Sequence, residues 1–154
     1  MAITNNTADT LGSDQKYIEL STFQVVGEWF AMDVLKVQEV MLPIKISTLP
    51  LAPEYIMGLI NVRGLIVTAI SLKQRLGFEQ LTYGEEYHNM LVNTPDGIIC
   101  LMVDEIGDVV DITQQDIFER PATVSNISTR FIQGVFKMED QLVTILDVDA
   151  VCAP

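Results

Sequence analysis

LINVRGLIVTAISL, residues 59–72, is a strongly apolar stretch that is interrupted once, by the turn sequence Asn61-Val62-Arg63-Gly64. Two aliphatic runs joined by a short turn that contains glycine predict a β-hairpin with Arg63-Gly64 at its tip. Similar short runs, in which apolar and polar residues tend to alternate, recur along the chain at residues 17–25, 30–34, 90–93, 98–103 and 141–146. A period of two predicts a mostly β protein.

Turn and capping residues separate these runs. Further tight turns are expected at Gly27-Glu28, at Pro95-Asp96-Gly97 and at Glu139-Asp140. Only short helices are expected. They are residues 53–57 closed by Gly58, residues 72–76 with Ser71 as N-cap and Gly77 after the last turn, and a last turn capped by Asp147.

The chain repeats itself. A shift of 76 positions lays YIMGL, residues 55–59, on FIQGV, residues 131–135, and a shift of 71 lays Met32-Asp33 on Val103-Asp104 and Pro50 on Pro121. Two copies of about 77 residues, each with about five strands, have the size of two small closed barrels. We therefore expect two packed five-stranded barrels, approximately residues 16–80 and 81–154, with an aliphatic groove between them.

The composition excludes several classes of protein. A net charge of −12 without a cluster of lysine or arginine disfavours nucleic acid as a partner. No secretory signal is recognised and no apolar run reaches the length of a membrane span, which predicts a cytoplasmic protein without membrane insertion, preceded by a disordered lead at residues 1–15. Cys100 and Cys152 are expected to be buried thiols.

Little in the sequence suggests catalysis. His88 is the only histidine and no metal-ligand spacing is present, so we expect neither a metal nor a cofactor. The acidic residues Asp104, Glu105, Asp108 and Asp111 could supply a carboxylate pair, but their position around Gly107, at the end of a strand, favours a solvated rim. We expect no enzyme, and a small-molecule-binding or enzymatic barrel remains the distant alternative.

Two features allow more than one interpretation. The second copy has Glu139-Asp140 where the first has Arg63-Gly64, so the fold needs a polar turn but not an arginine. Arg63 is either a solvated turn residue or an interface anchor. Residues 34–42 are apolar on both faces and are either buried between the barrels or line the groove that receives a partner helix.

Five segments in order resemble one known family. They are YIELSTF, FAMDVLKVQEV, LP-APEYIMGLINVRGLIVTAISLKQRLG, ICLMVDEIGDVVDI and FIQGVFKMEDQLVTILDV, which together cover about residues 17–150. The NVRG turn before an aliphatic strand and the VDEIGDV stretch, residues 103–109, carry most of the resemblance. They are similar to the CheW-like coupling proteins of bacterial chemosensory arrays.

The resemblance implies a fold, partners and site residues. It implies two interlocked SH3-like barrels in a non-enzymatic adaptor that is monomeric alone, forms rings in arrays, and is recruited to membrane receptor arrays. Its partners would be the regulatory domain of a CheA-type histidine kinase and the cytoplasmic helical hairpin of chemoreceptors. Val37 and Gly58 match family positions for kinase binding, and Glu39, Arg63 and Val109 match positions for receptor binding.

Some points stay open. A glycine in both copies, Gly58 and Gly134, is also explained by a helix end that needs a positive φ. Thr68 and Ser71 stand where many relatives have proline and aspartate, and many relatives continue as a helix beyond the position of Pro154. The same adaptor role in a non-flagellar pathway, serving twitching, surface sensing or a second messenger, is the nearer alternative.

Overall fold

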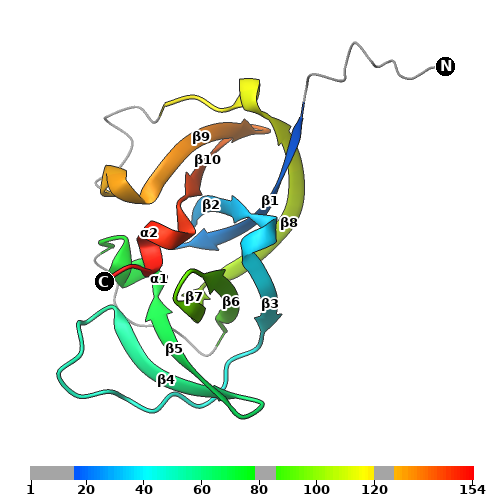
Figure 1. Cartoon of the computed structure of the whole chain (residues 1–154). Coiled ribbons are helices and arrows are strands. Elements are labelled where there is room, and N and C mark those ends of the chain that lie inside the picture. Colours follow the sequence, from blue (N-terminus) through cyan, green and yellow to red (C-terminus); the bar gives the residue numbers. More distant parts are fainter. Residues whose placement is uncertain (1–15, 79–85, 120–126) are drawn as a thin grey trace.

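Two five-stranded sheets make up the computed structural model, which describes residues 16–78, 86–119 and 127–154 (Figure 1). One sheet has the strand order β8-β1-β2-β10-β9 and the other β3-β6-β7-β5-β4. The strands are β1 (Tyr17–Val25), β2 (Glu28–Asp33), β3 (Val37–Met41), β4 (Ile56–Val62), β5 (Leu65–Ser71), β6 (His88–Thr94), β7 (Gly97–Val103), β8 (Glu105–Thr113), β9 (Ile132–Met138) and β10 (Gln141–Leu146). The mostly β prediction is confirmed.

Helices are short, as expected. They are α1 (Leu72–Arg75) and α2 (Val148–Cys152), with 3₁₀ turns at Val34–Lys36, Gln114–Asp116 and Thr129–Phe131. Ser71 and Asp147 cap the two α-helices, because their side-chain oxygens accept hydrogen bonds from the amides of Gln74 at 3.3 Å and Ala150 at 3.2 Å. Both predicted caps are confirmed.

The predicted helix over residues 53–57 is wrong. That segment forms turns, and β4 begins at Ile56. Gly58 therefore lies inside a strand rather than after a helix, and its positive φ of 146° has another cause. A Cβ at Gly58 would lie 2.2 Å from the carbonyl oxygen of Ser47, which bridges to Leu59. Glycine is needed here because another segment passes against its backbone.

Each sheet takes strands from both copies of the repeat. β1 and β2 of the first copy join β8, β9 and β10 of the second, while β6 and β7 join β3, β4 and β5. The chain crosses from one sheet to the other after β2 and again after β7. The two copies are therefore interlocked, and neither sheet can form from one copy alone.

Strand pairing corrects the alignment of the two copies. Thr68 of β5 and Thr144 of β10 are equivalent under the shift of 76, and each pairs with a parallel strand. Thr68 pairs with Ile99 and Thr144 pairs with Phe30, so Phe30 in the first copy corresponds to Ile99 in the second, which is a shift of 69 (99 minus 30). The shift of 71 is thus wrong for β2, although it holds for the bridges Ser47–Leu59 and Phe118–Val135. Pro121 lies outside the described residues, as do the boundary near residue 80 and the lead at residues 1–15.

Turn residues adopt left-handed conformations where the hairpins close. Arg63 has a φ of 50° and Glu139 a φ of 55°, at equivalent tips between β4 and β5 and between β9 and β10. The turn predicted at Gly27-Glu28 lies one residue earlier, at Val26-Gly27, and Val26 carries a φ of 50°. Both predicted polar tips are confirmed.

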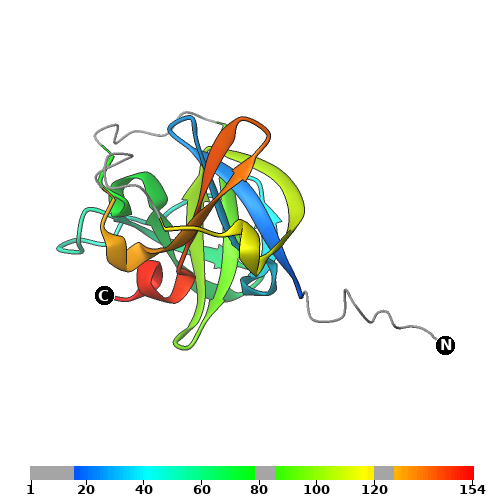
Figure 2. The same ribbon diagram turned by 90° about the horizontal axis from the view of Figure 1, so that it is seen from above.

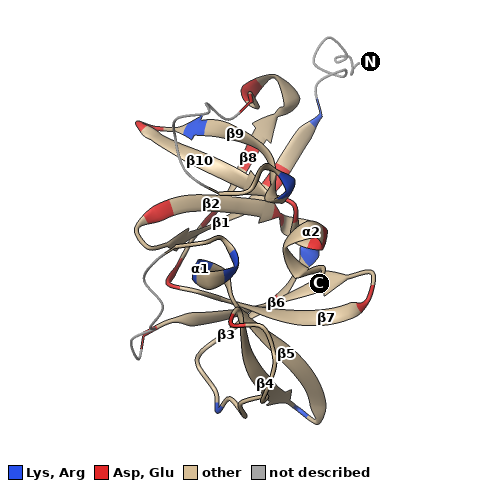
Figure 3. Cartoon of the chain, turned by 90° about the vertical axis from the view of Figure 1, so that its left-hand side faces the viewer, with Lys and Arg blue, Asp and Glu red and all other residues tan. Residues whose placement is uncertain are grey.

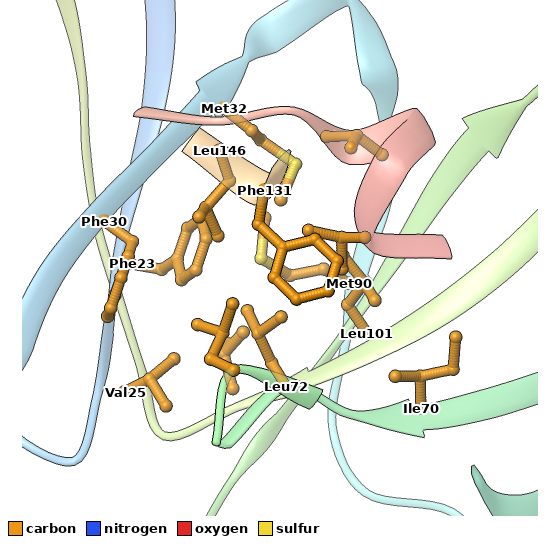
Figure 4. Packing of buried hydrophobic residues seen from close by; sticks show 14 of the residues in the cluster. Phe23, Val25, Phe30, Met32, Ile70, Leu72, Met90, Leu101, Phe131 and Leu146 are labelled. Atoms are coloured by element: carbon orange, nitrogen blue, oxygen red, sulfur yellow. The ribbon is translucent and has the colours of Figure 1, made fainter. Parts of the chain in front are cut away.

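The largest cluster of buried side chains lies between the two sheets. Phe23 and Phe30 come from one sheet, Met90 and Leu101 from the other, and Leu72 from α1 fills the space between them (Figure 4). Two smaller clusters occupy the interiors of the individual barrels. The predicted aliphatic groove between the barrels is therefore wrong, because the chain's own side chains fill that seam.

Ion pairs brace both crossings between the sheets. Lys73 of α1 is 2% exposed, and its Nζ lies 3.2 Å from Oδ1 of Asp104, which stands between β7 and β8. Lys36, between β2 and β3, pairs with Asp149 of α2 at 3.1 Å, where both side chains are partly exposed. The helices lie side by side (Figures 1 and 2), and each holds a crossing segment of the other copy.

Candidate partner-binding surface

Glu39 and Arg63 form an exposed ion pair between β3 and the tip of the β4–β5 hairpin. Arg63 uses both terminal nitrogens: Nη1 lies 3.3 Å from Oε2 of Glu39, and Nη2 makes a closer contact with Oε1. The hydrogen bond to Glu39 and the charge of that carboxylate raise the pKa of Arg63 above its ordinary value. The structure thus brings together two residues that lie 24 positions apart in the sequence.

The Arg63 side chain remains accessible despite this pairing. It is 66% exposed, and Glu39 is 35% exposed. Acidic residues outnumber lysine and arginine by 21 to 9, and Figure 3 shows positively charged positions at the end of the molecule formed by β4 and β5. A guanidinium held in one orientation by a bidentate carboxylate can still donate from its outer edge to a second acceptor.

Val37 and Glu39 flank an irregularity in β3. Val37 pairs with Val92, Glu39 pairs with Leu91, and Gln38 between them has no partner, which is the pattern of a β-bulge. Val37 is half-buried and packs against the cluster between the sheets. A change at Val37 therefore acts on the surface and on the seam together.

Gly58 does not offer a side chain or an open surface. It is buried on β4, beneath the segment that contains Ser47. Because the backbone of Ser47 occupies the position of a Cβ, a larger residue there would displace the loop between β3 and β4. We expect any effect of Gly58 on partner binding to act through the position of that loop.

Val109 lies in the other sheet, on β8, and is 53% exposed. β8 is an edge strand, and Val109 pairs with Ser21 of β1. Within the described parts of the chain, no hydrogen bond or ion pair links Val109 to Glu39 or Arg63. The three receptor-site candidates thus lie on two sheets.

The acidic stretch near Val109 differs from its prediction. Residues 105–113 form a nine-residue strand rather than the start of a turn. Asp104 is not a solvated rim residue, because it pairs with buried Lys73 and accepts a hydrogen bond from the Val26 amide at 2.7 Å. Asp108 and Asp111 are exposed on β8, as a rim would be.

Exposed apolar side chains lie mainly in the first copy. Residues 34–42 are not buried: Leu35 is 82% and Leu42 73% exposed. An open hollow of about 500 Å³ lies beside the β4–β5 hairpin and is lined by Ile44, Lys45, Ser47, Leu59, Ile60, Asn61 and Ile66. Exposed apolar surface next to an oriented arginine is typical of a protein contact surface.

Sequence patterns did not indicate three residues with structural roles, two on α1 and one in the hollow beside the β4–β5 hairpin. Lys73 is a buried lysine, and Arg75 lies over the rings of Tyr55 at 4.2 Å and Phe131 at 4.9 Å while its Nε donates to the Val151 carbonyl at 2.8 Å. Ile66 lines the hollow. The repeat offered one signal, because the 76-residue shift lays Tyr55 on Phe131, the two rings that Arg75 contacts.

The described residues hold no cluster of metal ligands, and their thiols are free. Within residues 16–78, 86–119 and 127–154, no group of three or more His, Cys, Asp or Glu could hold a metal ion. Both cysteines are free, and burial raises the pKa of Cys100 and of Cys152 to about 12. None of the helices in these segments has the length and apolar character of a membrane span.

Comparisons with family models, with curated sequences and with solved structures all point to the same family. The model of the CheW-like domain family matches residues 19–153. The chain is 27% identical to the chemotaxis protein CheW of Treponema pallidum, covering 88% of this chain and 82% of that protein, and 28% identical to that of Helicobacter pylori, covering 90% and 83%. The crystal structure of the scaffolding protein TtCheW from Thermoanaerobacter tengcongensis superimposes with a TM-score of 0.80 at 29% identity, covering 88% of this chain and 92% of that one.

Proposed function

Because the chain belongs to the CheW-like domain family, a family of chemotaxis scaffold and adaptor proteins, we propose that it couples chemoreceptors to a CheA-type histidine kinase. It would do so in the cytoplasm, without catalysis, after recruitment to membrane receptor arrays. One partner is the regulatory domain of the kinase, and the other is the helical hairpin at the cytoplasmic tip of the receptor. In arrays, barrel-to-barrel contacts would close the components into rings.

The observation that carries this proposal is the oriented arginine at the β4–β5 tip. Arg63 occupies a turn position whose equivalent in the second copy is Glu139 with nearly the same φ, so the fold does not require its guanidinium. Glu39 nevertheless holds that guanidinium by two hydrogen bonds, on a hairpin whose strands also line an open hollow. An exposed group that the fold does not need, held in a fixed orientation, supports a contact with another molecule.

We assign the kinase contact to the region of Val37 and Gly58, and the receptor contact to Glu39, Arg63 and Val109. Val37 is half-buried and Gly58 is buried, so both act by setting the shape of β3, β4 and the loop between them. Glu39, Arg63 and Val109 present side chains directly. The division predicts different effects: a change at Arg63 weakens one contact, and a change at Val37 weakens the other.

Coupling would follow from the rigid connection between the two sheets. Since each sheet contains strands of both copies, and buried side chains fill the seam, the sheets resist moving independently. A receptor that alters its contact free energy at one surface therefore alters the bias felt by the kinase at the other. A coupling of about 1 to 3 kcal/mol is sufficient for this control.

A pull-down and activity experiment tests the proposal. Wild-type protein is mixed with the isolated kinase regulatory domain and with a receptor hairpin fragment, beside the variants Arg63→Glu and Val37→Asp. We expect wild type to bind both partners, Arg63→Glu to lose the receptor fragment, and Val37→Asp to lose the kinase domain. If neither partner binds wild type, the proposed function is wrong.

The pathway served is a separate matter. The same adaptor role in a non-flagellar chemosensory system would use the same surfaces with a different receptor. Binding measured against receptor tips from each chemosensory system of the source organism would assign the pathway, because only the matched tip should give receptor-dependent kinase control.

A further inference from the structure

β8 carries a bulge immediately before Val109. Ser21 of β1 pairs with Val109, but Phe23 pairs with Ile106, so Thr22 on one strand faces Gly107 and Asp108 on the other without regular pairing. An extra residue in an edge strand bends it and turns the next side chain in a new direction. The next side chain here is Val109, which is 53% exposed.

Two side chains from the neighbouring strands β1 and β2 pack against this bulge. The hydroxyl of Thr22, a fully buried residue, donates to the Asp108 carbonyl at 2.5 Å. Trp29 of β2 reaches past β1 to Gly107: a Cβ on that glycine would lie 2.6 Å from Cζ3 and 3.0 Å from Cη2 of the indole. The same Cβ would lie 2.5 Å from the Thr22 hydroxyl oxygen. Gly107 is thus the residue that lets β8 approach its own sheet at the bulge.

The equivalent edge strand in the other sheet has a bulge at nearly the same place. β3 is irregular between Val37 and Glu39, where Gln38 is unpaired. Strand pairing with the shift of 69 lays Val40, which is 40% exposed, on Val109. A bulge followed by an exposed valine therefore occurs in both copies. Only the bulge in β8 has a glycine, Gly107, packed against a tryptophan, Trp29.

We propose that Thr22, Trp29 and Gly107 are positioning residues that set the direction of Val109 for the receptor hairpin. This inference rests on the proposed function, since Val109 is assigned there to the receptor contact. The acidic side chains of Asp108 and Asp111 stand on either side of Val109 along the exposed edge. The partner that fits this edge is a helix whose apolar stripe is flanked by lysine or arginine.

The test measures affinity for both partners by titration calorimetry, using the full chain. Gly107→Ala should weaken binding of the receptor hairpin fragment by about tenfold, because its Cβ forces β8 away from Trp29, and should leave the affinity for the kinase domain within about twofold. Thr22→Val, which removes the hydroxyl at nearly constant volume, should weaken receptor binding by about threefold or more, and Thr22→Ser should restore it.

Two controls separate positioning from general damage. Thr94→Val removes another threonine hydroxyl that donates to a backbone carbonyl, that of Gly97 at 2.8 Å, but in the turn between β6 and β7, and should change neither affinity. Adding Trp29→Phe to Gly107→Ala removes the indole atoms that collide with the new Cβ and leaves only the contact with the Thr22 hydroxyl, so it should recover part of the receptor binding.

The outcomes distinguish this inference from the proposed function. If wild type binds the receptor fragment and Gly107→Ala binds it equally well, the positioning role is wrong while the adaptor role stands. If Gly107→Ala weakens both partners alike and Trp29→Phe restores neither, the bulge is only structural and the inference fails. If wild type binds no receptor fragment, the proposed function itself has failed.

Discussion

The two hairpin tips, Arg63-Gly64 and Glu139-Asp140, occupy equivalent places in the two copies of the repeat and differ in what their side chains do. Both begin with a residue at a φ of 50° to 55°, and both join strands of the same register. Only the first carries a guanidinium paired with a carboxylate of another strand. The fold therefore specifies the backbone of the tip, and the choice of arginine reflects another requirement.

The largest difference in stability between the two copies should appear at the equivalent glycines, Gly58 and Gly134. Gly58→Ala should lower the free energy of unfolding by about 4 kcal/mol, because φ is positive and the added Cβ meets a backbone carbonyl. Gly134→Ala should cost about 1 to 2 kcal/mol, since its Cβ meets a methyl group of Ile117 that can rotate away. Urea denaturation measures both, and equal costs would contradict the assigned cause.

The second largest difference in stability should appear between the ion pairs Lys73–Asp104 and Lys36–Asp149. Asp104→Ala leaves the ammonium of Lys73 buried and removes an acceptor from the Val26 amide, and should cost about 3 kcal/mol. Asp149→Ala breaks a pair that is partly exposed on both sides and should cost at most about 1 kcal/mol, less at high salt. A salt-insensitive loss for Asp149→Ala, or a smaller loss for Asp104→Ala, would show that burial does not separate them.

Substitutions at the hairpin tips should have a smaller effect on stability, and Glu139→Asn should stabilise the protein rather than destabilise it. Asparagine is preferred at left-handed turn positions, so Glu139→Asn should raise the melting temperature by about 1 to 3 °C. Arg63→Asn gains the same turn preference but loses the contact with Glu39, and should leave the melting temperature within about 2 °C of wild type. A loss well beyond that for Arg63→Asn would mean that the arginine serves the fold.

Near neutral pH the smallest effect comes from the two thiols. Burial raises the pKa of both thiols to about 12, while an unfolded cysteine titrates near 8.5. The folded state therefore keeps protons that the unfolded state releases, so this contribution to stability is fully present below about pH 8.5 and is lost as pH rises toward 12. Thiol labelling at pH 8 should modify both cysteines in urea and neither in buffer, and rapid labelling of Cys100 in buffer would contradict its burial.

Local patterns in the sequence predicted the central part of the fold. The alternation in residues 17–25 and 141–146, the glycine after Arg63 and the caps Ser71 and Asp147 are set by neighbouring residues, so they could be recognised without the structure. The edge strand β8 could not, because its acidic and glycine residues interrupt the alternation and resemble a turn. Its strand character depends on pairing with β1, which lies far away in the sequence.

The groove between the barrels was predicted wrongly for a related reason. Whether Phe23 and Met90 face solvent or each other depends on the exchange of strands between the copies, which the period of the sequence does not reveal. Lys73 was missed because its partner Asp104 is distant in the sequence and reaches it only when α1 packs against β7. The repeat singled out Arg63, whereas Val37, Glu39, Gly58 and Val109 came from the family resemblance. The pairing of Glu39 with Arg63 became visible only in three dimensions.

The measurement that tests the adaptor account most directly is receptor-dependent kinase activity with Arg63→Asn, compared with Glu139→Asn as the matched change at the equivalent tip. Both variants keep a favourable turn residue, so both should fold. We predict that Glu139→Asn supports control of the kinase as wild type does, whereas Arg63→Asn loses most of it. Full control with Arg63→Asn would contradict the claim that this arginine is present for a partner.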